Sequence, residues 1–309
     1  MKCMTQDKGR GWALYHGDCI EVLAGLPDVS IDYSIYSPPF QSLYTYSSSE
    51  RDLGNTRDDE EFFTAYGFVI SDVLRLTKPG RLSSVHCMNL PTSKAKDGYI
   101  GIKDFRGKII RAHEDAGWIY HSEVLVWKDP VTAMQRTKAL GLLHKQLAKD
   151  SCMSRQGVPD YVCTFRKPGL NPEPVSGELD RWVGDGTFVR TGRLSIDIWQ
   201  RYASPVWMDI NPSRTLQKAS ARDERDERHI CPLQLDVIER CLQLWTNHGD
   251  VVLSPFAGIG SEGYVSVGAG RKFIGIELKD SYYAQAVKNL QNAGGQLDAF
   301  DGKDGADGQ

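Results

Sequence analysis

The chain of 309 residues is 40% hydrophobic and 25% charged with a formal net charge of −3, which excludes collagen-like, wholly disordered and disulfide-scaffold proteins and argues at first against nucleic acid as a partner. No run approaches the roughly 18 apolar residues of a membrane span, and residues 1–10 are charged where a signal peptide would be apolar, so we expect a cytoplasmic protein with no membrane partner. The 7 cysteines include no C-x-x-C pair, which favours reduced thiols and no metal site.

Strands and helices alternate over the first 130 residues. An apolar run at 30–36 stops before Pro38-Pro39, because consecutive prolines remove two ladder donors and fix φ. Residues 62–74 show helical spacing, and Lys78-Pro79-Gly80 ends that helix before a short apolar run at 82–85. A helix at 109–116 ends at Gly117 and is followed by a strand at 118–127. This alternation predicts an α/β sheet.

The regular pattern weakens between residues 131 and 207. In 131–170, seven Lys and Arg residues face only Asp150 and Asp160, which leaves a local charge of +5. Residues 168–207 have few periodic stretches and many Trp and Arg residues. We therefore expect an insert here. On charge alone, a solvated face is the simpler interpretation of the basic window.

Regular structure is expected to resume at Pro232, which opens a helix with an apolar face up to Trp245. A strand at 250–253, a helix at 261–267 and a strand at 272–276 follow, and Asp280 is expected to cap a last helix that runs to about Leu290. Residues 294–309 hold four Asp against Lys303 alone, so this segment carries −3 and residues 1–293 sum to zero. We expect this acidic tail to be disordered.

A glycine-rich turn joins the expected strand at 250–253 to the helix at 261–267. The turn consists of Ser254, Pro255, Phe256, Ala257, Gly258, Ile259 and Gly260. Glycines let the backbone approach a ligand, and Glu277, at the tip of the next strand, can accept both hydroxyls of a ribose. The spacing therefore predicts a bound nucleoside. Gly258, Gly260 and Gly263 also fit G-x-G-x-x-G, which alone would indicate a dinucleotide or a plain tight turn.

A second turn, Ser37-Pro38-Pro39-Phe40, follows the strand at 30–36. We expect it to be rigid and to lie at the carboxyl edge of the sheet, where open α/β proteins place their ligands. It offers main-chain carbonyls beside a hydroxyl and an aromatic ring, a set that can accept hydrogen bonds from a planar amine and stack on it. The alternatives are a plain strand terminator and, for Phe40, core packing.

Both turns resemble motifs of the S-adenosylmethionine-dependent DNA amino-methyltransferases. Ser37-Pro38-Pro39-Phe40 is similar to their S/D/N-P-P-Y/F catalytic motif, and residues 250–260 resemble their D-P-F-x-G-x-G cofactor loop, with Glu277 as the ribose acid. Asp18 resembles the acid that approaches the cofactor adenine, and Pro232 with Gln234 resembles the stretch that completes the methionine side. The catalytic motif comes first along the chain, as in the permuted beta class.

The resemblance implies a Rossmann-like methyltransferase sheet with circularly permuted motif order. Residues 1–130 would form the catalytic half, 131–207 a target-recognition and DNA-binding insert, 208–293 the cofactor half and 294–309 the tail. The implied catalytic residues are Ser37, Pro38, Pro39 and Phe40. The implied cofactor-binding residues are Asp18, Pro232, Gln234, Ser254, Phe256, Ala257, Gly258, Gly260 and Glu277. Double-stranded DNA is the implied partner, and the residues expected to contact its phosphates are Arg136, Lys138, Lys145, Lys149 and Arg155. A homodimer and a cognate restriction nuclease stay open.

The resemblance also implies a direct methyl transfer without a covalent enzyme intermediate. The Ser37 hydroxyl and the Pro38 carbonyl would accept the hydrogens of an exocyclic base amine and draw its nitrogen towards tetrahedral geometry. The base would have to leave the duplex stack, with Phe40 stacking on its face.

The target base and the competing functions depend on single residues. Ser37 in the first motif position is the form most often associated with cytosine N4, so we predict site-specific methylation there, with adenine N6, or low sequence specificity, as alternatives. Ser254 replaces the family's usual Asp, which keeps open a DNA-binding protein without turnover. An NAD-dependent oxidoreductase is disfavoured because Pro255-Phe256-Ala257 separates the strand from the glycines.

Overall fold

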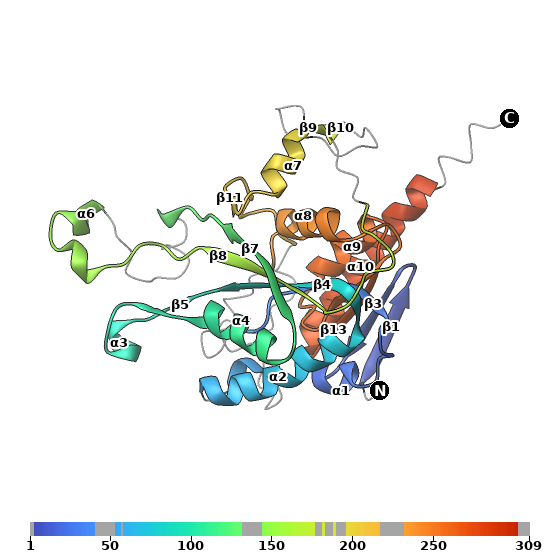
Figure 1. The fold of residues 1–309 in the computed structure, drawn as a ribbon, viewed down its shortest axis with the longest axis horizontal. Helices are drawn as coiled ribbons and strands as arrows, with labels where there is room; N and C mark the ends of the chain where they lie inside the picture. Colours follow the sequence, from blue (N-terminus) through green and yellow to red (C-terminus); the bar gives the residue numbers. More distant parts are fainter. Residues whose placement is uncertain are drawn as a thin grey trace.

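The computed structural model describes residues 3–40, 53–56, 58–131, 144–176, 181–182, 188–189, 196–216 and 232–301. Among these residues, nine strands form one sheet in the order β1-β2-β13-β12-β3-β4-β8-β7-β11 (Figure 1). The strands are β1 (Thr5–Gly9), β2 (Trp12–His16), β3 (Ile31–Tyr36), β4 (Thr77–Met88), β7 (Ile119–Val126), β8 (Asp160–Arg166), β11 (Val206–Trp207), β12 (Val251–Ser254) and β13 (Lys272–Glu277). Only β1 and β8 run antiparallel to their neighbours in this sheet. The predicted α/β class is therefore confirmed.

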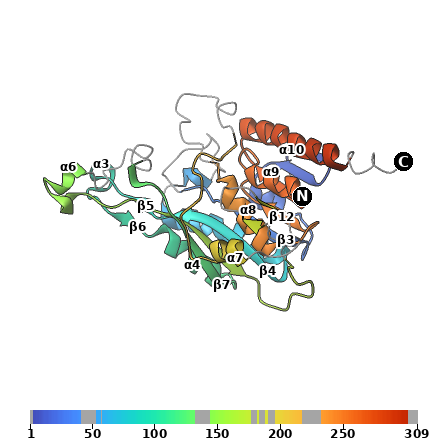
Figure 2. The same cartoon turned by 90° about the horizontal axis from the view of Figure 1, so that it is seen from above.

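Helices cover both faces of the sheet (Figures 1 and 2). One face packs against α8 (Leu235–Trp245), α9 (Ser261–Gly268) and α10 (Asp280–Asp301), and the other against α1 (Cys19–Leu23), α2 (Asp59–Leu76) and α4 (Phe105–Asp115). The remaining elements are α3 (Lys94–Asp97), α6 (His144–Leu147), α7 (Ile196–Tyr202), the 3-10 turns η1 (Leu53–Asn55) and η2 (Ser151–Met153), and the strand pairs β5 (Leu90–Pro91) with β6 (Ile102–Lys103) and β9 (Arg181–Trp182) with β10 (Phe188–Val189). No helix in the described ranges is long and apolar enough to cross a bilayer.

The middle of the chain contributes more to the sheet than the sequence predicted. β8 lies between β4 and β7 and pairs with both, and β11 extends the sheet beyond β7. Residues 160–166 and 206–207 therefore form strands of the sheet. β1 and β2 were not predicted either. Every residue of β1 is exposed and gives no alternating pattern, and the five residues of β2 are mostly buried and do not alternate either.

Three predicted boundaries also differ. Lys78-Pro79-Gly80 does not end α2; the helix stops at Leu76 and these residues begin β4, where the pairing with β3 is irregular. Asp280 is the first residue of α10, and its carboxylate contacts His16 Nε2 at 2.9 Å. The helix continues to Asp301, so the backbone of residues 294–301 is helical, and residues 302–309 lie outside the described part of the tail.

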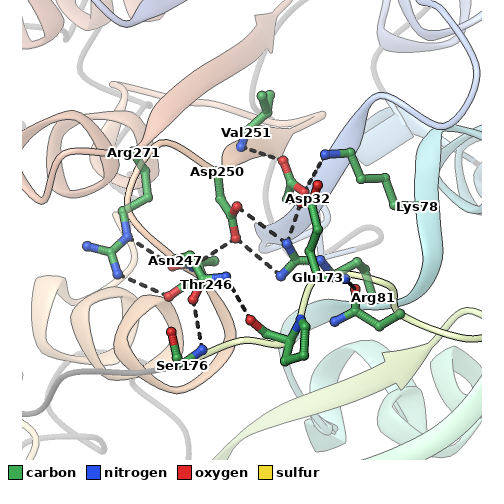
Figure 3. A network of polar contacts seen from close by, with 12 residues as sticks. Asp32, Lys78, Arg81, Glu173, Ser176, Thr246, Asn247, Asp250, Val251 and Arg271 are labelled. Carbon is green, nitrogen blue, oxygen red and sulfur yellow. Dashed lines mark hydrogen bonds and ion pairs between the residues drawn. The ribbon is translucent and has the colours of Figure 1, made fainter.

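A network of buried charges joins the amino ends of the central strands (Figure 3). Arg81 of β4 is 2% exposed and lies between Asp32, at 3.2 Å, and Asp250, at 3.2 Å. Asp32 also receives Lys78 Nζ at 2.7 Å and the main-chain amide of Val251 at 2.9 Å. The network therefore ties β3, β4 and β12 together at the edge opposite their carboxyl ends.

Candidate active site

The topology brings the two sequence motifs to one edge of the sheet. Because β2, β13, β12, β3 and β4 are parallel, their carboxyl ends lie side by side, and β8, which is antiparallel, starts at the same edge. A pocket opens there between the motifs. Its lining includes Gly17, Asp18, Cys19, Ser37, Pro38, Pro39, Phe40, Leu53, Pro232, Leu233, Pro255, Phe256, Ala257, Gly258, Ile259, Ser261, Glu262, Ile276, Glu277, Leu278, Lys279 and Tyr282.

Glu277 is held at the end of β13 by main-chain donors. Its Oε2 accepts the Gly258 amide at 2.8 Å, and its Oε1 accepts the Lys279 amide at 2.9 Å. Asp18 caps α1 by accepting the Ile20 amide at 2.9 Å. The two acids that the sequence selected thus lie on the pocket wall, oriented by the backbone.

The three glycines of the G-x-G-x-x-G match have different roles. Gly258 has φ +53, and a Cβ added there would meet nothing within 4 Å, so it borders open space in the pocket. Gly260 is the N-cap of α9, and its Cβ would lie 3.2 Å from Ala286 of α10. A Cβ on Gly263 would lie 2.5 Å from the Phe273 ring. Gly260 and Gly263 therefore allow close packing, so the dinucleotide-like pattern is not itself a ligand signal.

Three predicted cofactor residues do not line the pocket: Gln234, Ser254 and Gly260, which packs against α10. Ser254 is fully buried, and its Oγ has no hydrogen-bond partner among the described residues. Gln234 occupies the N-cap position of α8 without a side-chain cap bond, and its Oε1 is also buried without such a partner in the described ranges. Pro232, Phe256 and Ala257 do line the pocket.

The Ser-Pro-Pro-Phe turn forms the other wall. Ser37 and Pro39 are half-buried and Pro38 is buried. Phe40 is 8% exposed; it lines the pocket and also packs edge-on against Phe105, with ring centroids 6.2 Å apart. The two interpretations of Phe40, pocket wall and core residue, are therefore compatible.

A polar chain behind Ser37 was not found in the sequence. His86, near the end of β4, places Nδ1 3.2 Å from Ser37 Oγ and Nε2 3.1 Å from Asp160 Oδ2, and Lys128 also contacts Asp160. Burial raises the pKa of Asp160, but the charges of Lys128 and His86 and their hydrogen bonds outweigh it, so the pKa lies below its usual value. Asp160 reaches His86 only through the pairing of β8 with β4, which no local pattern predicts.

Glu262 is a second residue that sequence reasoning missed. It lies in the first turn of α9, is 4% exposed and lines the pocket. Burial raises its pKa to about 8; its own main-chain amide opposes this shift and the charge of Glu277 adds to it. The neighbouring Ser261 hydroxyl is buried without a hydrogen-bond partner in the described part of the chain. The pocket thus holds polar groups that a ligand could satisfy.

The residues predicted to bind DNA are only partly described. Arg136 and Lys138 lie outside the described residues, and for Lys145 only the backbone is described. Lys149 is exposed, and Arg155 is half-buried with its guanidinium donating to the Gln156 carbonyl at 2.9 Å. Neither Lys149 nor Arg155 lines the pocket. They belong to residues 127–159, which connect the end of β7 to the start of β8. Val126 and Asp160 are paired, so both ends of this connection lie at the pocket edge of the sheet.

A sheet covered on both faces, with a glycine-bordered pocket and an acid at its carboxyl edge, is the arrangement of nucleotide-cofactor enzymes. A family model described as DNA methylase matches residues 31–288. The type II methyltransferase M1.MboII of Moraxella bovis is 40% identical over 279 residues, which cover 88% of this chain and 94% of that protein. The chain therefore belongs to the N6/N4 DNA methylase family.

Solved structures show the same fold. TTHA0409 from Thermus thermophilus, described as a DNA modification methylase and complexed with S-adenosyl-L-methionine, aligns with a TM-score of 0.63 at 21% identity over 91% of this chain and 95% of that one. The cytosine-N4-specific PvuII DNA methyltransferase aligns with a TM-score of 0.54 at 16% identity over 93% of this chain and 92% of that one. The Rossmann-like methyltransferase sheet is thus confirmed, and the family match leaves no support for an NAD-dependent oxidoreductase.

Proposed function

We propose that the protein transfers a methyl group from S-adenosylmethionine to an exocyclic base amine in double-stranded DNA, with cytosine N4 as the target. The observation that carries the proposal is the shared pocket, in which the Ser37 turn faces the Gly258 loop and Glu277. The Ser37 motif position and the named specificity of the PvuII enzyme favour cytosine; adenine N6 is the alternative within the same family.

The pocket residues fit the cofactor. Gly258 borders space that a side chain would fill, Glu277 presents a carboxylate fixed by amides, and the Ser261 hydroxyl on the pocket wall is buried without a hydrogen-bond partner among the described residues. Glu277 would hold the ribose hydroxyls, Asp18 the adenine, and the region of Pro232 the methionine side. When bound, S-adenosylmethionine supplies an electrophilic methyl group.

The chain's own residues prepare the amine. Its lone pair is delocalised into the base ring, which makes it a weak nucleophile. Ser37 Oγ and the Pro38 carbonyl would accept its two hydrogens and favour a tetrahedral nitrogen, while the Phe40 ring supports the base. A base in a stacked duplex cannot reach a pocket of this kind, so the enzyme must flip it out.

The DNA itself would bind over the pocket edge. Residues 127–159 emerge there, and Figures 1 and 2 show α6, within this segment, projecting beyond the sheet. We infer that Arg136, Lys138, Lys145, Lys149 and Arg155 contact phosphates, and that the irregular region 168–207 reads the base sequence. Site specificity, a homodimer and a cognate restriction nuclease remain predictions.

The test is incubation with tritiated S-adenosylmethionine and DNA, followed by digestion and mass spectrometry of the nucleosides. N4-methylcytosine is the expected product. N6-methyladenine would move the proposal to the alternative base, and label only in RNA or a small molecule would refute it.

A double variant tests the assignment of the catalytic turn. Ser37→Ala with Pro39→Ala should abolish turnover while calorimetry shows unchanged cofactor binding, because the cofactor loop is untouched. Ser30→Ala, before the same strand β3 but at its amino end, is the matched control and should keep full activity. Lost cofactor affinity in the double variant would mean that the turn is misassigned.

A further inference from the structure

Three neighbouring strands place a line of polar groups behind Ser37. Ser37 follows β3, His86 lies on β4 and Asp160 begins β8. The ring of His86 spans the gap, with Nδ1 3.2 Å from Ser37 Oγ and Nε2 3.1 Å from Asp160 Oδ2. His86 is 8% exposed and Asp160 is 2% exposed, so the ring and the carboxylate are mostly buried, whereas Ser37 at the pocket is half-buried.

The charge beside His86 favours one tautomer. Nε2 lies 3.1 Å from Asp160 Oδ2, a contact that lacks hydrogen-bond geometry among the described residues. The negative charge of this carboxylate favours a proton on Nε2, because an ionised carboxylate only accepts. In a neutral ring, Nδ1 is then an acceptor that faces the Ser37 hydroxyl. That hydroxyl has a second acceptor, the main-chain carbonyl of His86, also at 3.2 Å. Both contacts hold Ser37 against β4 and leave an oxygen lone pair for another donor.

The charges around the ring support a proton acceptor at this place. In the described part of the chain, Asp160 contacts His86 and Lys128 contacts Asp160. Positions 86 and 162 are paired, as are 88 and 160, so His86 and Asp160 share one face of the sheet. The pair Arg106 and Glu123 lies with Cys163 on the other face. Among the described residues, a positive ring would therefore be next to a buried carboxylate, and the nearby cation would be Lys128, which already contacts that carboxylate.

We propose that His86, oriented by Asp160, accepts the proton that the target amine loses, and that Ser37 relays this proton to it. This proposal rests on the proposed function. As the amine nitrogen bonds to the methyl carbon, the carbon–sulfur bond breaks and the nitrogen is left with one proton too many. That proton passes to Ser37 Oγ while the Ser37 hydroxyl proton moves to His86 Nδ1. The positive charge ends on the ring beside Asp160 and leaves as a proton to solvent, so no further reactant is needed.

His86 and Asp160 are positioning residues in this scheme, because they act through Ser37. The test is the pH profile of the single-turnover rate with saturating cofactor and DNA. We expect the wild-type rate to fall at acid pH, where a protonated ring cannot accept. His86→Asn keeps a hydrogen-bond acceptor near the position of Nδ1 but cannot take up a proton. The single-turnover rate of this variant near neutral pH should therefore fall about 100-fold, with cofactor affinity unchanged. The decrease in rate at acid pH, which we call the acid limb of the profile, should disappear.

Asp160→Asn provides a second variant that keeps size and an acceptor for Lys128. Without the carboxylate the protonated ring is less stable, so the acid limb should move to lower pH and the maximal rate should fall. The matched control is His121→Gln, which removes an exposed histidine on β7 and should leave the profile unchanged. If the His86 and Asp160 variants both retain the wild-type acid limb, the proposal is wrong.

A measurement without turnover separates this proposal from the proposed function. Nitrogen-15 NMR of the ligand-free protein should show His86 protonated at Nε2 when neutral. An inactive wild type would refute the proposed function and the proton path with it. An active wild type with His86 protonated at Nδ1, or an active His86→Asn variant with an intact acid limb, would overturn the proton path alone.

Discussion

The two edges of the central sheet use similar residues in opposite ways. At the amino edge, the buried Arg81 guanidinium is compensated by Asp32 and Asp250, which in turn hold main-chain amides (Figure 3). At the carboxyl edge, Ser261 and Glu262 line the pocket; the Ser261 hydroxyl is buried without a hydrogen-bond partner among the described residues, and burial raises the pKa of Glu262.

Each of these strands therefore has residues that stabilise the fold at its amino end and residues of the candidate active site at its carboxyl end. β3 begins at the charge network and ends at the catalytic turn, and β12 begins beside Asp250 and ends at the glycine loop. Fixing the strands at one edge allows their other ends to keep polar groups available for a ligand. Changes at the amino edge should therefore alter stability, and changes at the carboxyl edge should alter binding, pH dependence or rate.

The largest effect is expected from Arg81→Met. It leaves the carboxylate of Asp250 without its cation and Asp32 with Lys78 alone, and breaking a buried pair in this way costs about 3–5 kcal/mol. Lys78→Met is the control, since Lys78 is 34% exposed and should cost about 1 kcal/mol or less. Urea unfolding measures both, and cofactor affinity of the folded protein should stay constant. Equal costs for the two variants would mean that the network does not fasten this edge.

Glu262 gives the carboxyl edge a specific pH dependence. With a pKa raised from 4.5 to about 8, the folded protein binds a proton that the unfolded chain has lost between these values. The free energy of unfolding should therefore decrease as pH rises through this window, by about 2 kcal/mol between pH 6 and pH 8. Glu262→Gln should remove this decrease in urea unfolding. An unchanged pH dependence in the variant would show that Glu262 is ionised throughout.

The same carboxyl group should link cofactor binding to pH. The positive charge of S-adenosylmethionine favours the ionised form of Glu262, so affinity should rise as pH increases towards 8. Calorimetry on Glu262→Gln should show a weaker rise. A pH-independent affinity in the wild-type protein would place the carboxylate away from the charged part of the cofactor.

Two glycines of the G-x-G-x-x-G match have different roles: Gly263 allows close packing, and Gly258 borders the pocket. Gly263→Ala would force a methyl group against Phe273, at about 1–3 kcal/mol of stability, with cofactor affinity retained. Gly258→Ala meets no protein atom, but its φ of +53 costs about 1 kcal/mol, and the methyl group enters the pocket, so affinity should fall about tenfold. Unfolding and calorimetry on the pair measure this contrast, and a reversed pattern would contradict the assigned roles.

Sequence reasoning recovered the parts of the molecule whose signals are local. The Ser37 turn and the strand–glycine loop–helix unit that ends at Glu277 are marked by proline, glycine and apolar periodicity within short windows. β8 was missed because it lies in a basic window and is bounded by the charged residues Asp160 and Arg166. Its place beside His86 depends on strand order, which pairs residues far apart in the chain.

The smallest effect concerns the segment 127–159 at the pocket edge. If Lys149 contacts a phosphate, Lys149→Ala should lower the slope of log affinity for DNA against log salt by about 1 and weaken binding similarly for all sequences. Lys272→Ala is the control, because Lys272 is exposed at the amino edge and should leave the slope unchanged. Since residues 1–293 carry no net charge, the wild-type slope itself should be modest. Equal slopes for the wild type and both variants would mean that Lys149 does not contact DNA. A lower slope for Lys272→Ala would mean that DNA also contacts the amino edge of the sheet.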